Sequence, residues 1–371
     1  HPDKYLSLEA GIKALYVMGT SLMCLESGSS GTQAHPYTWG VPEEHRKRGY
    51  SYNEEPPRRY RETIRKCHLF IKENPRAKGT PETKIALGLG CNDGYIGANT
   101  VPWAQHGSRA ACTNGTINFW GPSYPEMTWD RAREVFFPFL GTRGADGMPY
   151  GQGDVIGIDD QTRMSDISRY SMIAFGGWNT MTLRAKNLLE KWMSKGGTCV
   201  LCLPQCSVRD DRDFVNYTTK DLMMPCGLSV DGFETVEGFE VARLAKDSRV
   251  EVLETIGRDK LPLVVRCPVG KGWLYLLLAK QYPGGIPRFW GVWKKLLADC
   301  AVQVEQSMTL KQVSPEHKLG FFIYAVYDDA AYLLNVDMHK PHKVVVTLDG
   351  QAMEHEVAPL EVKIFNRKKK K

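Results

Sequence analysis

A carboxylate at the end of an apolar segment is the first candidate for chemistry in this sequence. Residues 21–25, SLMCL, are typical of a short buried strand, and Glu26 follows at once, ahead of a loop rich in glycine and serine. If Glu26 faces a pocket, its carboxylate can bind a substrate or take part in acid–base or nucleophilic chemistry. The alternative is a strand-end glutamate that points into solvent. The local sequence leaves both interpretations open.

A second candidate is the long loop between Asn92 and Trp129, which is rich in aromatic and polar side chains. Loops of this length inside a compact domain are usually functional or disordered, and tryptophans argue against disorder. Aromatic rings stack on the C–H faces of sugars, while carboxylates and amides bind sugar hydroxyls. The predicted substrate-binding residues are Asp93, Tyr95, Trp103, Gln105, Trp120 and Glu126. The alternative is a loop whose aromatic rings pack together as a small core of their own.

Two other kinds of active site are not supported by the residues. The segment GLGCNDGYIGANTV has several glycines, but it lacks the GxGxxG spacing of a nucleotide site, and no helix begins there. A glutamine amidotransferase-like domain needs a cysteine nucleophile on the turn after its central strand. The segment IAFGGWNTMT has Trp178, Asn179 and Thr180 at that turn. Catalysis by this region alone is therefore not indicated.

The cysteines do not suggest a metal or redox site. Cys199 and Cys202 form a CxxC pair inside an apolar run, with no second pair to complete a set of ligands. The pattern favours buried strand thiols, and we expect neither a bound metal nor a cofactor. Two matches to the N-glycosylation pattern, at residues 114–116 and 216–218, weakly favour an extracellular or secretory location.

Composition limits the classes of partner. The 371 residues suggest two or three domains. The formal charge of +6 includes the terminal run Lys368–Lys371, which is more often a solvated tail than a contact for nucleic acid. No stretch of 18 apolar residues occurs, so we expect a soluble protein that binds neither nucleic acid nor membrane.

The periodicity of apolar residues changes twice along the chain. Residues 1–82 contain a helix closed by Gly19, the strand at 21–25, and a helix between Pro57 and Pro75. Residues 83–302 alternate strands and helices, including a helix expected over residues 129–141, which predicts a doubly wound, mostly parallel sheet. Residues 303–371 show short alternating strands and an Asp349-Gly350 hairpin signal, which predicts an antiparallel β sandwich with a basic tail.

This order of elements resembles the C-terminal half of a multidomain glycoside hydrolase, of the β-galactosidase family whose middle domain is called the trimerisation domain. The similar segments include ALYVMGTSLMCLESG, RETIRKCHLFIKENPRAKGTPETKIALGLGCNDGY, IAFGGWNTMTLRAKNLLEKWMSKGG and GWLYLLLAKQYPGG. The resemblance is architectural and covers nearly the whole chain. It implies an α/β chain in three domains: residues 1–82 as the end of a TIM barrel, residues 83–302 as an amidotransferase-like or flavodoxin-like domain, and residues 303–371 as the β sandwich.

The resemblance also implies a function, which is hydrolysis of O-glycosidic bonds by two carboxylates about 5 Å apart. In the family this pair comes from the fourth and seventh barrel strands, whereas Glu26 matches the eighth, where it would bind substrate; a nucleophile role is the alternative. One or two βα units cannot close a barrel. We therefore expect an incomplete catalytic pair, and a homo-oligomer or a missing barrel segment as partner. The alternative function is a non-catalytic carbohydrate-binding or assembly module.

Overall fold

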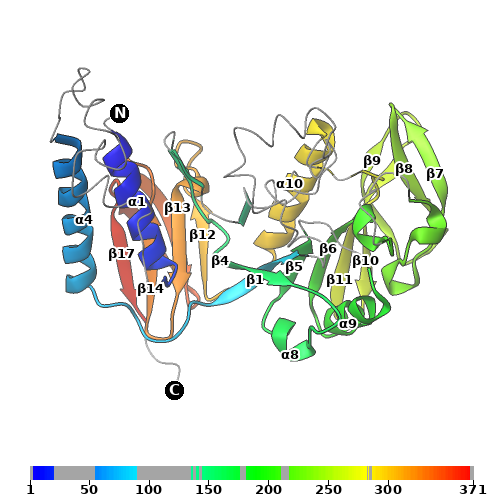
Figure 1. Cartoon of the computed structure of the whole chain (residues 1–371), viewed down its shortest axis with the longest axis horizontal. Coiled ribbons are helices and arrows are strands. Elements are labelled where there is room, and N and C mark those ends of the chain that lie inside the picture. Colours follow the sequence, from blue (N-terminus) through cyan, green and yellow to red (C-terminus); the bar gives the residue numbers. More distant parts are fainter. Residues whose placement is uncertain are drawn as a thin grey trace, which may run out of the picture. The chain divides into compact units, whose positions relative to one another are not determined.

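The computed structural model describes residues 3–20, 55–89, 135–136, 139–141, 144–175, 181–209, 217–281, 283 and 286–367. The chain divides into two compact units. Unit 1 consists of residues 1–82, 137–152 and 306–371, and unit 2 of residues 83–136 and 153–305. Figure 1 colours the chain by position in the sequence, from blue at the N-terminus to red at the C-terminus.

Unit 2 is built on a seven-stranded sheet. In spatial order its strands are β4 (Gln152–Gly157), β1 (Thr83–Leu89), β5 (Met172–Phe175), β6 (Thr198–Cys202), β11 (Gly272–Leu277), β10 (Leu261–Val269) and β9 (Glu251–Ile256). The pairs β1–β5, β5–β6 and β6–β11 are parallel, and the pairs β11–β10 and β10–β9 are antiparallel. The parallel-dominated α/β sheet expected from the sequence is therefore present.

The remaining elements of unit 2 are short except for two helices. They are α8 (Met164–Ile167), α9 (Leu183–Ser194), α10 (Pro287–Val302), the hairpin β7 (Val230–Val236) and β8 (Phe239–Leu244), and 3₁₀ turns at Leu203–Cys206, Thr219–Asp221 and Pro225–Gly227. Helix α9 contacts β6, β10 and β11, whereas α10 contacts β5. The periodicity of the sequence predicts strands at 239–245, 249–254 and 262–279, the last with a Gly-Lys-Gly hairpin, and a helix at 287–301, and all of these are confirmed.

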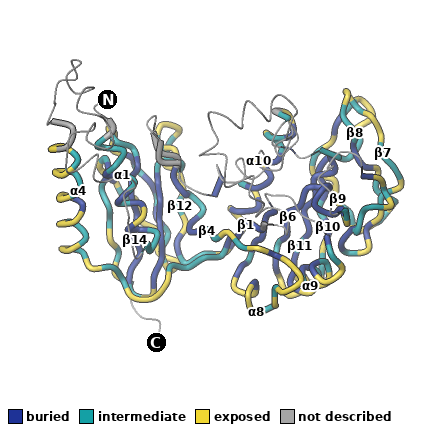
Figure 2. The backbone as a smooth tube through the Cα atoms, in the orientation of Figure 1, coloured by how far each residue is buried: buried dark blue, intermediate teal, exposed yellow. Residues whose placement is uncertain are grey.

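The central strands of this sheet are covered on both faces. Every residue of β5 is buried, and so is every residue of β6 from Cys199 to Cys202, as the dark blue tube in Figure 2 shows. Side chains alternate between the two faces of a strand, so a run of consecutive buried residues requires a layer on each side.

Unit 1 combines two helices with two three-stranded sheets. The helices are α1 (Asp3–Val17) and α4 (Glu55–Glu73). One sheet contains β12 (Met308–Gln312), β15 (His342–Leu348) and β16 (Gln351–Val357), and the other contains β13 (Phe322–Val326), β14 (Ala330–Asn335) and β17 (Val362–Asn366). Unit 1 also has a two-stranded ribbon, β2 (Phe139–Gly141) and β3 (Gly144–Asp146), and a 3₁₀ turn at Leu319–Phe321. Both sheets are antiparallel.

The sheet that contains β13 and β14 divides unit 1 into two cores. Along β13, Phe322, Tyr324 and Val326 point into a core shared with the other sheet, through residues such as Val344. The alternate residues of β13 point into the second core, where the α1 side chain of Tyr16 packs. The layers of unit 1 are therefore the helices, the β13–β14–β17 sheet and the β12–β15–β16 sheet.

This packing differs from the three predicted domains, because the predicted first and last segments fold as one unit. Tyr16 contacts the ring of Tyr332 edge-on at a centroid distance of 5.6 Å, and its hydroxyl donates to the Asn74 carbonyl at 2.8 Å. Strand β14 is apolar on both faces, so it needs a second cover in addition to the other sheet. The barrel origin of residues 1–82 stays a prediction.

Two local expectations can be compared with the structure directly. The helix predicted over 129–141 is wrong at its end, because Phe139–Gly141 forms strand β2 and pairs with β3. The hydrogen bonds between these two strands outweigh the local preference for a helix. The hairpin signal is confirmed, since Asp349 and Gly350 have positive φ angles of 48° and 85° between β15 and β16.

An ion pair between a buried carboxylate and an exposed lysine joins α1 to α4. The Glu9 carboxylate in α1 is 4% exposed and accepts hydrogen bonds from Lys13 at 2.7 Å and from Lys66 of α4 at 2.8 Å. Burial raises the pKa of Glu9, but the hydrogen bonds from the two lysines outweigh it, so that the pKa lies below its ordinary value. Glu9 is therefore ionised in the folded chain at neutral pH.

Replacing Glu9 by glutamine should lower the free energy of unfolding by about 1.5–3 kcal/mol, the range for hydrogen bonds to charged groups. Because the folded pKa is depressed, this contribution is present above the unfolded pKa of Glu9 and is lost as the pH falls through the folded pKa. Urea denaturation at several pH values measures both effects. The control is Glu62→Gln, which removes an exposed ion pair with Arg58 on α4 and should cost under about 0.5 kcal/mol. Equal losses in the two variants would contradict the role assigned to Glu9.

Candidate functional site

The residues predicted from the sequence to bind or process a sugar lie outside the described residues. These are Glu26, Asp93, Tyr95, Trp103, Gln105, Trp120 and Glu126. Their roles and their grouping in one cleft stay predictions. The structure does describe the element that carries the loop, because β1 ends at Leu89, directly before it.

Strand β1 occupies a special place in the sheet of unit 2. Its neighbours are β4 and β5, the next two strands of this sheet along the chain, on opposite sides. Numbered in chain order, the strands β4, β1, β5, β6 and β11 follow the flavodoxin-like order 2-1-3-4-5. In open α/β sheets, ligands bind outside the carboxyl ends of the strands where the order reverses. The point of reversal here lies beside the carboxyl end of β1.

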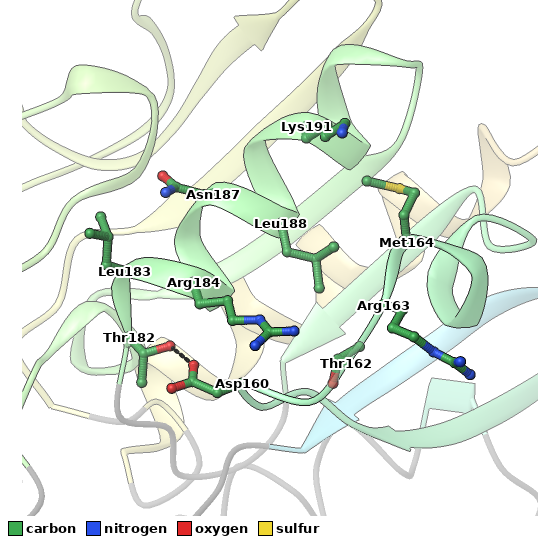
Figure 3. A pocket seen from close by; sticks show the side chains of 10 residues that line it. All are labelled: Asp160, Thr162, Arg163, Met164, Thr182, Leu183, Arg184, Asn187, Leu188 and Lys191. Atoms are coloured by element: carbon green, nitrogen blue, oxygen red, sulfur yellow. Dashed lines mark hydrogen bonds between the residues drawn. The ribbon is translucent and has the colours of Figure 1, made fainter.

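An acidic side chain from the segment after β4 meets the N-terminus of α9. The Thr182 hydroxyl caps α9 by accepting a hydrogen bond from the Ala185 backbone N–H at 3.1 Å, and it donates a short hydrogen bond to the Asp160 carboxylate. An anion at this end of a helix is favoured by the helix dipole. The arrangement fixes Asp160 against the first turn of α9, as the dashed line in Figure 3 shows.

The turn before α8 also depends on a carboxylate. Asp159 accepts hydrogen bonds from the backbone N–H groups of Gln161 at 2.8 Å and Thr162 at 3.0 Å. The bond from Gln161 is the largest of the influences that lower the pKa of Asp159. Asp159 is thus a carboxylate that holds a turn, and the neighbouring Asp160 is the one directed at α9.

A surface groove of about 680 Å³ runs along the exposed face of α9. Figure 3 shows its lining side chains, which are Asp160, Thr162, Arg163, Met164, Thr182, Leu183, Arg184, Asn187, Leu188 and Lys191. The groove therefore offers three cations, one carboxylate, hydroxyl and amide groups, and apolar side chains of which Leu183 is 61% exposed. Sequence reasoning missed it, because it joins the α9 face to a segment near α8 and corresponds to no motif.

The groove has the chemistry of a binding surface. Its lining contains no cysteine, histidine or serine, and its one carboxylate, Asp160, accepts a hydrogen bond from the Thr182 cap of α9. Within the described ranges, no three histidine, cysteine or acidic side chains gather in a way that could hold a metal ion. The lining can bind a polar or anionic ligand.

The thiols of β6 and of the 3₁₀ turn that follows it are structural. Cys199 and Cys202 lie fully buried in β6, as the sequence predicted, and neither forms a disulfide. Burial raises the pKa of both thiols well above the usual value, and it raises that of Cys206 to about 12. These cysteines are therefore protonated and weakly nucleophilic at neutral pH.

Among known proteins, the chain is similar to solved structures and to no family model or curated sequence. No protein-family model matches the chain, and no curated protein matches it. A GH42 beta-galactosidase from G. stearothermophilus matches 88% of the chain at 14% identity with a TM-score of 0.46, and the chain covers 45% of it. The alpha-L-fucosidase isoenzyme 2 from Paenibacillus thiaminolyticus matches 84% of the chain at 11% identity with a TM-score of 0.43, with 51% of its own length covered.

A beta-galactosidase from Bacillus circulans sp. alkalophilus matches 82% of the chain at 13% identity with a TM-score of 0.42, and the chain covers 45% of it. The chain thus spans about half the length, or less, of the solved structures that it resembles. None of the helices in the described part of the chain is long and apolar enough to cross a membrane.

The contact between Asp160, Thr182 and α9 can be tested by changing the cap. Thr182→Ala removes the hydroxyl that both partners use and should lower the free energy of unfolding by about 1 kcal/mol. Hydrogen exchange of the Ala185 amide should also become faster, because this N–H loses its acceptor. Thr182→Ser keeps the hydroxyl and is the matched control. An unchanged exchange rate at Ala185 in Thr182→Ala would exclude the capping role.

Proposed function

We propose that this chain takes part in carbohydrate processing, as the C-terminal part of a glycoside hydrolase that acts on O-glycosidic bonds. In this proposal the chain supplies a sugar-binding surface at the carboxyl edge of the unit 2 sheet. The catalytic pair of carboxylates is not completed within the chain. This function is the one that the sequence resemblance implies, and the strand order of unit 2 adds where the sugar would bind.

The observation that carries the proposal is the position of β1 between β4 and β5. It puts the carboxyl end of β1 at the reversal of strand order, where α/β sheets bind ligands. The segment that leaves this end contains the aromatic, amide and carboxylate residues expected to bind a sugar, with Trp103 and Trp120 as stacking rings. The expected position of a ligand and the chemistry of these residues thus both favour a sugar site at the carboxyl edge of the sheet.

Residues near the N-terminus of α9 extend this surface. The connection from β5 to α9 begins after Phe175 and ends at Thr182, so the cap of α9 belongs to the same edge as the end of β5. Asp160 and Asn187 add a carboxylate and an amide from the groove along α9. Such groups form hydrogen bonds with sugar hydroxyls.

The proposal gives Glu26 a substrate-binding role. Glycoside hydrolysis needs an acid and either a nucleophile or a base, each a carboxylate on one side of the scissile bond. The sequence resemblance assigns these two to other barrel strands, and Glu26 to the eighth. The alternative, a non-catalytic carbohydrate-binding or assembly module, predicts the same binding of sugars but gives Glu26 no contact with a reacting bond.

Oligosaccharide binding tests the stacking role of Trp103. In Trp103→Ala the affinity of the chain for a β-linked galacto-oligosaccharide should fall by about 1–3 kcal/mol, the scale of one stacked ring. The control is Trp273→Ala, because Trp273 is the second residue of β11 and so lies at the amino edge of the parallel strands. Isothermal titration calorimetry measures both. Equal losses in the two variants, or no binding by the unmodified chain, would count against the proposal.

Turnover tests the role given to Glu26. Since no catalytic pair is assigned to this chain, we expect no hydrolysis of aryl β-galactosides by it alone, measured as release of the aryl group. Glu26→Gln should weaken oligosaccharide binding and leave this absence of turnover unchanged. Strong hydrolysis that disappears in Glu26→Gln would show that Glu26 is a catalytic residue and would overturn the assignment.

A further inference from the structure

Two histidines that belong to different turns of unit 1 face each other at one end of its sheets. His317 lies between β12 and β13, and His342 is the first residue of β15. Their Nδ1 atoms are 3.4 Å apart, and their rings are almost perpendicular, at 86°. His342 is only 4% exposed and His317 is half-buried, so the pair lies where the interior of unit 1 reaches its surface.

The far side of the His342 ring is held by a carboxylate. Nε2 of His342 lies 2.8 Å from an oxygen of Asp337. The other oxygen of Asp337 accepts hydrogen bonds from the backbone N–H groups of His339 at 2.8 Å and Lys340 at 3.0 Å. The ionised carboxylate only accepts hydrogen bonds, so Nε2 carries the proton. In neutral His342, Nδ1 therefore keeps its lone pair, directed at His317.

The surroundings fix this ring before any ligand arrives. Phe321 stacks on His342 with ring centroids 4.2 Å apart and planes at 15°. Asn335, which is fully buried, donates hydrogen bonds to the carbonyls of Lys340 and Val357 and so ties down the turn that carries Asp337. A carboxylate behind a histidine and a rigid support are typical of metal-binding histidines.

The distance between the two nitrogens distinguishes a hydrogen bond from a pair of ligands. Hydrogen bonds from N–H donors in proteins span about 2.7–3.2 Å, so 3.4 Å is long for one. Two nitrogens bound to one tetrahedral zinc ion at about 2.0–2.1 Å lie about 3.3–3.4 Å apart. Neighbouring positions of a square-planar site would be closer, at about 2.9 Å for the same bond length.

We propose that His317 and His342 bind a divalent zinc-type ion through their Nδ1 atoms, with Asp337 positioning the ring of His342. The site has two protein ligands, because no group of three suitable side chains occurs in the described parts of the chain. Its other two tetrahedral positions are open to water or to a ligand atom from outside the pair. Binding requires the tautomer of His317 that carries its proton on Nε2, because Nδ1 must then present a lone pair to the metal ion. The inference is independent of the proposed function.

The test adds Zn²⁺ alone to the full chain labelled with ¹⁵N-histidine. Zinc should shift the Nδ1 resonances of His317 and His342 together and saturably, and leave those of His339 and His355 unchanged. No shift at His317 and His342 would overturn the proposal and leave a simple contact between two imidazoles. This readout separates the pair from the buried thiols, which could also bind zinc, and needs no variant that might unfold.

Variants then test each part of the site by zinc titration. His317→Asn keeps an N–H donor close to the position of Nδ1 but no nitrogen lone pair, so it can preserve a hydrogen bond to His342 while losing the site. Asp337→Asn keeps an oxygen for the turn and should weaken zinc binding about 10- to 100-fold. His339→Asn, which removes an exposed imidazole next to the turn, is the control and should not change affinity. Unchanged zinc affinity in His317→Asn would overturn the proposal.

Discussion

The architecture of both units follows from one constraint: a strand whose consecutive side chains are all apolar must be covered on both faces. In unit 1 this applies to β13 and β14, whose residues alternate between a core shared with the other sheet and a core shared with α1. In unit 2 it applies to β5 and β6. The helices and the second sheet are the covers that these strands require, and burial of this apolar surface is the dominant favourable term in folding.

Full cover of the sheet faces also determines where chemistry can occur. With both faces of β5 and β6 buried, polar groups that must meet a ligand are confined to the strand ends and the loops that leave them. The Thr182 cap and Asp160 lie at such a place in unit 2, as does the start of the loop after β1. In unit 1, the histidine pair likewise lies at strand ends, since His317 is in the connection before β13 and His342 is the first residue of β15.

Much of the fold could be predicted from local patterns. Most strand and helix positions of unit 2, but not β7 or α8, follow from periodicity, and the Asp349-Gly350 turn follows from the φ angles that these residues tolerate. What could not be predicted depends on contacts between distant segments. The sequence of α1 does not reveal that Tyr16 packs on Tyr332, and the helical pattern near Phe139 does not reveal its pairing with β3. The groove along α9 was missed for the same reason, because it joins residues near α8 to a helix that begins after β5.

Buried polar groups in unit 1 are of two kinds, which differ in whether an atom remains that could bind a ligand. The polar groups of Glu9 and Asn335 form hydrogen bonds within the fold, since Glu9 accepts from two lysines and the Asn335 amide donates to three carbonyls. Their removal would leave partners unsatisfied, so their role is stability. His342 differs, because Asp337 fixes only one nitrogen of its ring and so directs the lone pair of the other toward His317 across a distance too long for a strong hydrogen bond. In the proposed site this lone pair would go to a metal ion, which is the electron-pair acceptor that two facing imidazoles suit.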